Sequence, residues 1–514
     1  MARSSRTTPA RRKAATKATG AKKAGATKAG AKKPAAKKPV AKKATATKPT
    51  AKKAAATKPT AKKVAATKPT AKKAAATKPA AKKPAAKKAT AKKATATKPA
   101  AKPSAATQPV APGRLDDTAV RRIALFAQGL VVRPPGTLAQ IVAATGYLRT
   151  LGGIEAYVAL RARRPTLTRA TIDLAVGAGE LRVVPAMRGC MYLVPERHVD
   201  RCLALAESLT RVRDDREAER AGIREAELDQ LAAQVLVALR DGPATTDGLR
   251  KRLPDGAVRS LGAAGKKLGI SSPLPMALRR LEFAGAIVRA PERDRVDTER
   301  YAWRKRRGVP ELPTAAQLQR ELARSYYAWA GVGTVPELAA WSGLSQRDAE
   351  AATDAAGVPA VTLADGTRAF ADPEARAWAE REVDTVALLP FEDNLVALAG
   401  GPARWIAREH LQLSVPVWGS KQSKPLGDAR HLALRTIVAG DRIVGFWEYD
   451  PGKRDVVTAL LGKPAGALVD RVEAAAAELG SFVREEVGHG RSFSLDTDEA
   501  LRERVAALRK LVRR

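Results

Sequence analysis

Apolar residues recur with helical spacing between residues 121 and 163, and polar or charged residues fill the positions between them. The RPPG stretch at 133–136 interrupts this pattern, because proline removes a backbone donor and restricts the residue before it. The pattern therefore predicts helices over 121–130, roughly 137–147 and roughly 153–163.

The next stretch changes from helical to strand-like spacing. Thr168 precedes RATIDLAVGAG, whose final glycines favour a helix end, so we expect Thr168 to cap a helix. Residues 180–195, ELRVVPAMRGCMYLVP, predict two short strands around a turn that contains Pro185 and Gly189. Short helices followed by a basic hairpin are typical of a winged helix-turn-helix, in which a helix enters the major groove of DNA and the wing contacts the backbone.

The same order of elements occurs twice more. Residues 227–253 predict two helices, the second capped by one of two adjacent threonines, and 273–290 predict a third helix that leads into a strand. Residues 334–357 predict a further pair of helices. The following VPAVTLADGTRAF, 358–370, predicts another wing, because its Asp-Gly pair is a strong signal for a two-residue hairpin turn.

The character of the sequence changes near residue 383. The segments DTVALLPFEDNLVAL, HLALRTIVAGDRIVGFWEYD and RSFSLD have strand-like patterns, whereas GALVDRVEAAAAELGSFV and DEALRERVAALRKLVR have the pattern of amphipathic helices. We therefore expect a small α+β domain that ends in a helix.

Together these patterns predict a mainly α fold with small β wings (α+β), in which tandem winged helix-turn-helix units form an elongated or curved array. Acidic residues and periodic apolar residues both begin in APGRLDD, at 111–117, which marks the start of the folded part. The predicted parts are a disordered tail over 1–112, winged-helix units over 113–205, 206–310 and 311–382, and a C-terminal α+β domain over 383–514.

Charge separates the tail from the rest of the chain. Residues 1–110 contain 33 Lys or Arg and no Asp or Glu, whereas the remaining residues contain 60 basic and 52 acidic side chains. Phrases of ten residues such as AKKAAATKPT repeat from Ala41 to Ala100. Frequent proline, repulsion between like charges and little apolar surface predict that this tail is disordered in isolation.

The partner expected for such a tail is a polyanion. Each lysine that neutralises a phosphate releases counterions, which gives salt-sensitive affinity without sequence specificity. The tail resembles the C-terminal tails of linker histones and the Lys/Ala/Pro extensions of some bacterial nucleoid proteins. Double-stranded DNA is the favoured partner, and RNA is the alternative for the tail. We therefore expect the protein in the cytoplasm, associated with the nucleoid.

Several classes of protein are disfavoured by composition. The chain has two cysteines, Cys190 and Cys202, and four histidines, which leaves no pattern for a zinc site or a disulfide framework. No phosphate-cradling glycine loop or nucleophile motif occurs, so no cofactor is expected. No apolar run approaches the roughly 20 residues that span a bilayer, and no coiled-coil segment indicates a dimer, so a monomer without membrane contact is expected.

Six fragments then carry a resemblance to a known family. FAQGL, ALRARRPTLT, MRGCMYLVP, TVPELAAWSGL, LLPFEDNL and DRIVGFWEYD occur in this order. In this respect the chain resembles the AlkZ-like DNA glycosylases, tandem winged-helix proteins associated with repair of interstrand crosslinks and bulky alkylation adducts. The likeness covers roughly residues 115–512, and it implies a tandem winged-helix fold and duplex DNA as the partner.

The resemblance also implies a catalytic motif, Gln-x-Gln or Gln-x-Asp, whose side chains would activate water against the sugar of a damaged nucleotide. Its three positions here are Arg149, Thr150 and Leu151. None of them is a carboxylate or an amide, and Arg149 stays protonated in water. Glu155, on the following helix, is the alternative acid or base, although a solvent-facing helical glutamate is the plainer interpretation.

Basic residues near the predicted helices and wings are the candidates for DNA contact. Trp303 is flanked by several of them, although a strand-anchoring role is favoured for its side chain. The candidates are Arg188 in the first wing, then Lys266, Lys267, Arg279, Arg280, Arg304, Lys305, Arg306 and Arg307, and the tail lysines Lys42, Lys43, Lys52, Lys53, Lys62 and Lys63. Glu392 and Asp393 follow a predicted strand, and for these a turn-capping role is favoured over metal binding.

Three functions fit these features. The favoured one is a DNA-binding protein on a glycosylase scaffold, without catalysis, acting on damaged or distorted DNA. The second is an active glycosylase with a divergent site that excises alkylated or crosslinked bases. The third is an architectural or regulatory DNA-binding protein of the nucleoid. A carboxylate near residues 149–151 would favour the second.

Overall fold

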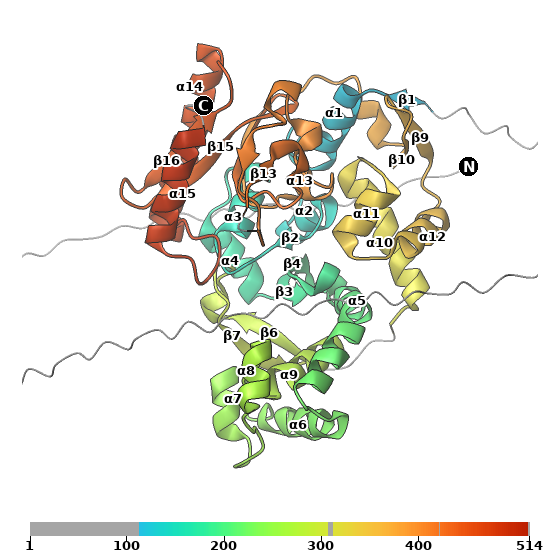
Figure 1. Cartoon of the computed structure of the whole chain (residues 1–514), viewed down its shortest axis with the longest axis vertical. Helices are drawn as coiled ribbons and strands as arrows, with labels where there is room; N and C mark the ends of the chain where they lie inside the picture. The colour runs from blue at the N-terminus through green and yellow to red at the C-terminus, as the bar shows by residue number, and fades with distance from the viewer. Residues whose placement is uncertain (1–112, 307–311, 421, 512–514) are drawn as a thin grey trace, which may run out of the picture. The chain divides into compact units, whose positions relative to one another are not determined.

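The computed structural model describes residues 113–306, 312–420 and 422–511, which Figure 1 shows as ribbons. The predicted DNA contacts of Arg307 and of the six tail lysines lie outside these residues. Within the described ranges no helix is long and apolar enough to cross a membrane. The fold combines many helices with small sheets, as the sequence predicts.

The first winged-helix unit has helices followed by a three-stranded sheet in the order β2-β4-β3. Thr168 caps α4 as predicted, because its hydroxyl accepts a hydrogen bond from the Thr171 amide at 3.1 Å. A tight turn at Met187–Gly189 joins β3 to β4 and carries Arg188. The elements are α1 (Asp117–Ala127), α2 (Leu138–Thr145), β2 (Leu148–Arg149), α3 (Glu155–Arg163), α4 (Arg169–Gly177), β3 (Leu181–Pro185), β4 (Met191–Pro195) and the connecting α5 (Val199–Arg220).

The second unit repeats this plan around its own apolar core, with the strand order β5-β7-β6. Thr245 caps α7 by accepting a hydrogen bond from the Gly248 amide. Trp303 is buried in this core and its indole donates to the Thr246 hydroxyl at 3.1 Å, which is the anchoring role favoured from the sequence. The elements are α6 (Glu225–Ala238), β5 (Ala244–Thr245), α7 (Thr246–Arg252), α8 (Gly262–Leu268), α9 (Leu274–Phe283), β6 (Ile287–Pro291) and β7 (Tyr301–Lys305).

The third unit shares its sheet with the first residues of the described chain. β1 (Arg114–Leu115) pairs in parallel with β9, and the sheet has the order β1-β9-β10-β8. The Asp365-Gly366 pair lies in the turn between β9 and β10, as the hairpin signal predicts. The other elements are α10 (Ala315–Ala330), β8 (Val332–Gly333), α11 (Val335–Ser342), α12 (Gln346–Ala356), β9 (Ala360–Leu363) and β10 (Arg368–Ala371).

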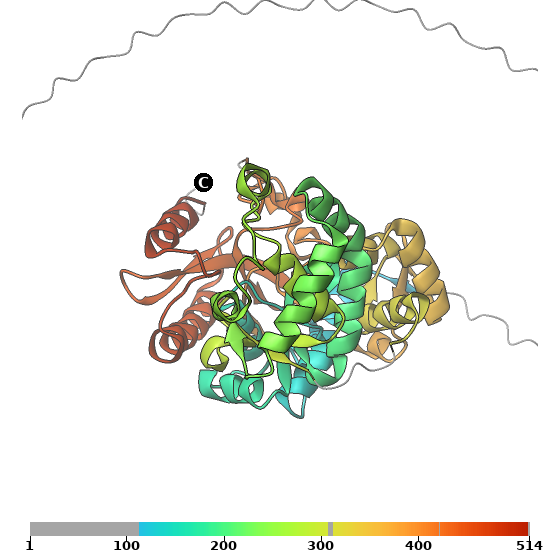
Figure 2. The same ribbon diagram turned by 90° about the horizontal axis from the view of Figure 1, so that it is seen from below.

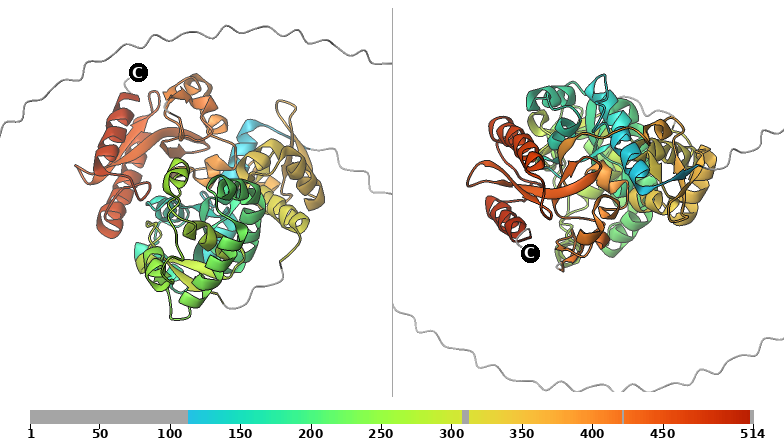
Figure 3. Two further views of the ribbon diagram at one scale, coloured as in Figure 1. Left: turned by 60° about the horizontal axis from the view of Figure 1, so that its bottom comes forward. Right: turned by 90° about the horizontal axis from the view of Figure 1, so that it is seen from above.

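The C-terminal part is an antiparallel sheet, β11-β14-β15-β16, with α14 and α15 on its two sides (Figures 2 and 3). The prediction of a strand over RSFSLD is wrong, because Phe493 makes only an isolated bridge to Gly152. The elements are β11 (Val386–Leu389), α13 (Asn394–Ala397), β12 (Ser414–Val415), β13 (Lys424–Pro425), β14 (Arg435–Ala439), β15 (Arg442–Asp450), β16 (Asp455–Leu460), α14 (Gly466–Phe482) and α15 (Asp498–Leu511).

The first unit, the third unit and the C-terminal part share one apolar core, to which the second unit adds Phe283 and Val296. Buried residues of the first unit such as Tyr157 belong to the same cluster as Tyr326 of the third unit and Trp447 of the C-terminal sheet. The described residues accordingly belong to a single compact unit, and the units pack around a common core where the sequence patterns predicted an elongated or curved array. This shared core brings loops of three parts together around one cavity.

Candidate functional site

The loop between β11 and α13 is fixed by buried polar contacts on both sides of Glu392. The Phe391 amide donates to the Glu155 carboxylate at 2.9 Å. Asp393 accepts two hydrogen bonds from the buried guanidinium of Arg163, at 2.8 and 2.9 Å, and also caps α13. The side chain of Asn394 donates to backbone carbonyls near the end of α2. This clamped loop leaves the Glu392 carboxylate directed away from the core.

Glu392 has an unusual backbone and two polar partners. Its φ is +50°, a conformation that non-glycine residues adopt only when the surrounding structure imposes it. Its carboxylate forms an ion pair with Arg149, and it lies 3.0 Å from Nδ1 of His431. Because a carboxylate can only accept, Nδ1 of His431 carries the proton, and the lone pair of a neutral imidazole lies on Nε2.

A cavity of about 280 Å³ opens beside this pair. We call it the Glu392 cavity. The wing turn of the first unit, α11 of the third unit and loops of the C-terminal part all contribute to its lining. The polar and aromatic residues that line it are Arg188, Trp341, Glu392, Arg430, His431 and Thr436.

Some polar atoms around the Glu392 cavity have no partner among the described residues. The Thr436 hydroxyl and Nε of Arg188 are buried and make no hydrogen bond within the described ranges. Nε of Arg149 is in the same state. Buried polar groups are normally satisfied, so such a concentration of unused donors indicates a place where a polar ligand or water binds.

Backbone strain is also concentrated here. Five non-glycine residues among the described ones have a positive φ, and two of these, Arg188 and Glu392, line the Glu392 cavity. Strained residues of this kind collect at functional sites, where the fold over-determines their conformation. Arg188 and Glu392 belong to different parts of the chain, so a single tight turn does not explain both positive φ angles.

The electrostatic surroundings keep His431 neutral. Burial lowers the pKa of His431 below its usual 6.5, and the positive charges of Arg188, Arg149, Arg430 and Lys424 lower it further. The ring is nevertheless about half exposed. A neutral, accessible imidazole whose tautomer is fixed by a carboxylate is a competent proton acceptor near pH 7.

The three positions of the predicted motif have different surroundings. Arg149 ends β2 and reaches Glu392. Thr150 is buried, and its hydroxyl donates to the Val296 carbonyl at 3.0 Å, so it faces the second unit. Leu151 is partly exposed and has no polar group. Of the three, Arg149 alone takes part in the arrangement around the Glu392 cavity.

The geometry gives Glu155 a structural role. It is 3% exposed, one carboxylate oxygen lies 2.6 Å from Arg435, and the other accepts from the Phe391 amide. Burial raises the pKa of the Glu155 carboxyl, and the charge of Arg435 opposes this effect. Since no water or sugar can reach these oxygens in this arrangement, the structure offers no support for Glu155 as a catalytic acid or base. Its side chain is buried, so the expectation of a solvent-facing glutamate is wrong.

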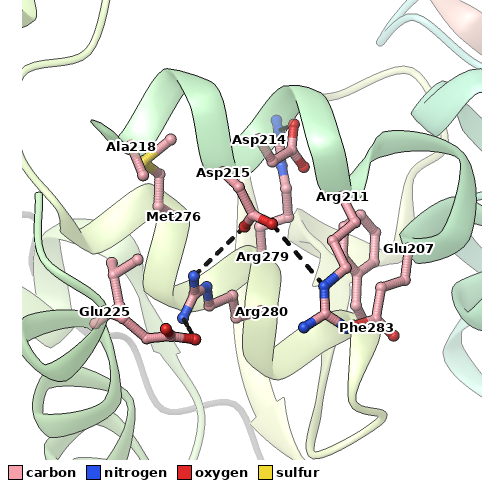
Figure 4. A pocket seen from close by; sticks show the side chains of 11 residues that line it. Glu207, Arg211, Asp214, Asp215, Ala218, Glu225, Met276, Arg279, Arg280 and Phe283 are labelled. Carbon is pink, nitrogen blue, oxygen red and sulfur yellow. Dashed lines mark hydrogen bonds and ion pairs between the residues drawn. The ribbon is translucent and has the colours of Figure 1, made fainter. Parts of the chain in front are cut away.

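The arginines on α9 are held by acidic residues of α5 and α6, as Figure 4 shows for a second hollow in the molecule. Arg279 lies 3.1 Å from Asp214, and Arg280 lies 3.6 Å from Asp215 and 3.7 Å from Glu225. Their charges are therefore largely neutralised within the chain, which weakens the prediction that they bind phosphate.

The remaining predicted DNA contacts do not converge on one site. Arg304 and Lys305 are exposed at the end of β7, and Lys266 and Lys267 lie on the short helix α8. Arg306 forms an ion pair with Asp200. Arg188 is the predicted basic residue that lines the Glu392 cavity.

Comparisons with known protein families and solved structures identify relatives of this chain. The family model for AlkZ-like DNA glycosylases matches residues 153–482. The chain belongs to the AlkZ-like DNA glycosylase family. The DNA glycosylase AlkZ of Streptomyces sahachiroi has a similar fold, with a TM-score of 0.56 at 18% identity over 74% of this chain and 99% of that one. Residues 3–128 match a family model for a histone H1-like nucleoprotein, and no curated protein matches.

Sequence reasoning missed His431 and Thr436, and it interpreted Glu392 as a turn cap. Asp393 does cap a helix, but its neighbour Glu392 points into the cavity. The sequence indicated this site only through the acidic pair that follows an apolar strand. The pair alone does not show which of the two carboxylates faces the cavity. His431 lies 39 residues further along, and its partner could not be identified from spacing.

Proposed function

We propose that this protein binds duplex DNA in a repair context, and that the Glu392 cavity receives part of a nucleotide drawn from the duplex. The observation that carries this proposal is the wing residue Arg188. Its guanidinium lines the cavity, no ion pair engages it among the described residues, and its buried Nε has no partner. A phosphate oxygen would satisfy these donors.

The rest of the cavity fits the same ligand. Trp341 is 4% exposed and packs against Tyr326 and Trp329, so it adds an apolar wall to the cavity. The Thr436 hydroxyl offers an unused hydrogen-bonding group. Arg430 adds a second positive charge at the rim. Membership of a family described as DNA glycosylases supports DNA as the ligand, since such enzymes act on a base only after it leaves the stack.

The tail has a separate task in this proposal. Its lysines give sequence-independent affinity for phosphates, and the covalent link keeps the folded part at high local concentration along DNA. An architectural role for the whole protein is the second candidate, favoured by the match of the N-terminal residues to a nucleoprotein model. In that case the tail would carry most of the affinity and the folded part would contribute little.

The test compares binding of the full chain and of residues 113–514 to labelled duplex DNA by fluorescence anisotropy at moderate salt. Residues 113–514 should prefer the duplex over RNA of the same sequence and over a neutral polymer. Arg188→Gln should weaken that binding roughly tenfold, because a charged hydrogen bond to phosphate is lost.

Arg280→Gln is the matched control, since its charge is already engaged by carboxylates and its affinity should stay within about twofold. Binding of residues 113–514 that is no stronger than binding to the neutral polymer would contradict the proposal and leave the architectural role. Preferential binding to RNA would identify a different partner.

A further inference from the structure

We propose that His431, held by Glu392, is the general base of a hydrolytic site in the Glu392 cavity, and that it takes a proton from the water that attacks an N-glycosidic bond. The inference rests on the proposed function, because it requires a nucleotide in the cavity. It assigns the water-activating role to residues outside the family motif, whose positions hold Arg149, Thr150 and Leu151 here.

The first support is the geometry of the pair. The Glu392 carboxylate lies 3.0 Å from Nδ1 of His431, which fixes the ring orientation and the tautomer. Nε2 then keeps its lone pair, and the half-exposed ring can be reached by water. A carboxylate in this position also stabilises the imidazolium that forms when the proton is transferred.

The second support is the way the chain holds Glu392. Glu155, Arg163 and Asn394 fix the backbone immediately before and after it. Arg149 binds the carboxylate itself. The chain thus maintains a strained residue in one orientation through several buried contacts. Such pre-organisation is what an acid or base requires, whereas a surface ion pair does not need it.

Arg149 acquires a defined role from this arrangement. It occupies the first motif position, and its guanidinium reaches the residue that orients His431. It is a positioning residue, since it acts through Glu392 and contacts no reacting atom. The arginine at the first motif position therefore contacts the carboxylate that holds the proposed base, His431.

The proposed step balances without any further reagent. The water oxygen forms a bond to C1′ of the sugar, one water proton moves to Nε2 of His431, and the C1′–N bond breaks with its electron pair going to the base. A base made cationic by alkylation leaves as a neutral molecule, and His431 then releases its proton to solvent water. A neutral base leaves as an anion that accepts the proton from His431, which returns the imidazole to its starting state.

The experiment uses the full chain with two duplexes, one treated with methyl methanesulfonate and one crosslinked by a nitrogen mustard. Released bases are quantified by mass spectrometry, and affinity for the same duplexes is measured in parallel. The wild type should release a base from at least one duplex. His431→Asn should slow release by about 100-fold or more while affinity stays within about twofold.

His410→Asn is the matched control, because this histidine lies in the same part of the chain and does not line the cavity. Glu392→Gln should reproduce the loss, so that the proposal does not depend on one variant folding well. Wild-type release should also be constant near neutral pH and decline as the pH falls through the pKa of His431. Burial and the positive charges of Arg188, Arg149, Arg430 and Lys424 lower this pKa, and Glu392 is the carboxylate that contacts the ring.

The outcomes separate this inference from the proposed function. DNA binding without release of any base from either duplex overturns the inference and leaves DNA binding intact. Release that survives His431→Asn, or that has no acid limb below pH 6.5, also overturns it. A full chain that does not bind the duplexes overturns the proposed function and the inference with it.

Discussion

Arg149 and Glu392 form an ion pair between the end of β2 and the loop before α13, residues that are far apart in the sequence. Their side chains are 22% and 13% exposed, so the pair is largely shielded from solvent. The pair connects the position of the family motif with the carboxylate that orients His431. The neutral state of His431 therefore depends on a residue that it does not contact directly.

Arg149→Gln is expected to raise the pKa of His431. The change removes a positive charge that lowers this pKa, and it frees the Glu392 carboxylate to stabilise the imidazolium. Titration followed by NMR of labelled histidine is practical because the chain has four histidines. In the activity assay, the acid limb should move to higher pH and the rate near neutral pH should fall.

Arg259→Gln is a suitable control for this titration, since Arg259 pairs with Glu227 in the second unit and does not line the cavity. An unchanged or lower pKa of His431 in Arg149→Gln would show that the ion pair does not act on the imidazole. Increased base release by Arg149→Gln would instead indicate that Arg149 blocks catalysis at the position of the family motif.

Glu155→Gln tests the buried network that holds the backbone beside Glu392. Glu155 and Glu448 both bind the fully buried guanidinium of Arg435, and removal of one charge leaves the arginine under-compensated. We expect a loss of about 3 kcal/mol in the free energy of unfolding. Urea denaturation provides the measurement, with the exposed Glu473→Gln as the control. A variant as stable as the wild type would contradict the structural role assigned to Glu155.

The sequence predicted what depends on local pattern. The cap at Thr168, the wing that carries Arg188 and the hairpin at Asp365-Gly366 all follow from signals within a few residues. The pairing of β1 with β9 and the shared core could not be predicted in this way, because they join segments hundreds of residues apart. Periodicity shows which face of an element is apolar and does not show which element covers it.

The candidate site illustrates the same limit for charged residues. An arginine on a helix can bind phosphate or a carboxylate of the same chain, and the sequence does not distinguish these partners. Arg280 is engaged by three acidic side chains, whereas Arg188 has no ion pair among the described residues. Likewise, Glu155 and Glu392 are both carboxylates near the motif, and only tertiary packing buries the first and directs the second into a cavity.

Asp297 links the second unit to the C-terminal part and should make stability depend on acid pH. Burial tends to raise the pKa of Asp297, but hydrogen bonds from Arg295 and His489, at 2.7 and 3.0 Å, lower the pKa to about 2. A carboxyl with a depressed pKa stabilises the fold above its unfolded value of 3.8, and this contribution is lost as the pH falls towards 2.

Asp297→Asn is therefore expected to lower the free energy of unfolding by about 2 kcal/mol at pH 7. It should also flatten the dependence of stability on pH between roughly 4 and 2. Denaturation at several pH values measures both effects, and Asp247→Asn, whose side chain is 91% exposed, serves as the control. A parallel pH profile for wild type and Asp297→Asn would exclude this carboxyl as the source.

Removal of residues 1–112 should change how strongly DNA binding depends on salt. The segment that is removed carries 33 basic residues through residue 110 and no acidic ones. Each lysine that neutralises a phosphate contributes about 0.9 to the slope of log affinity against log salt. The truncated protein should therefore show a much shallower slope and weaker binding at low salt, while Arg188→Gln should lower the affinity of either form with a change in slope of about one. Equal slopes for the full and truncated chains would show that the tail does not contact the DNA backbone.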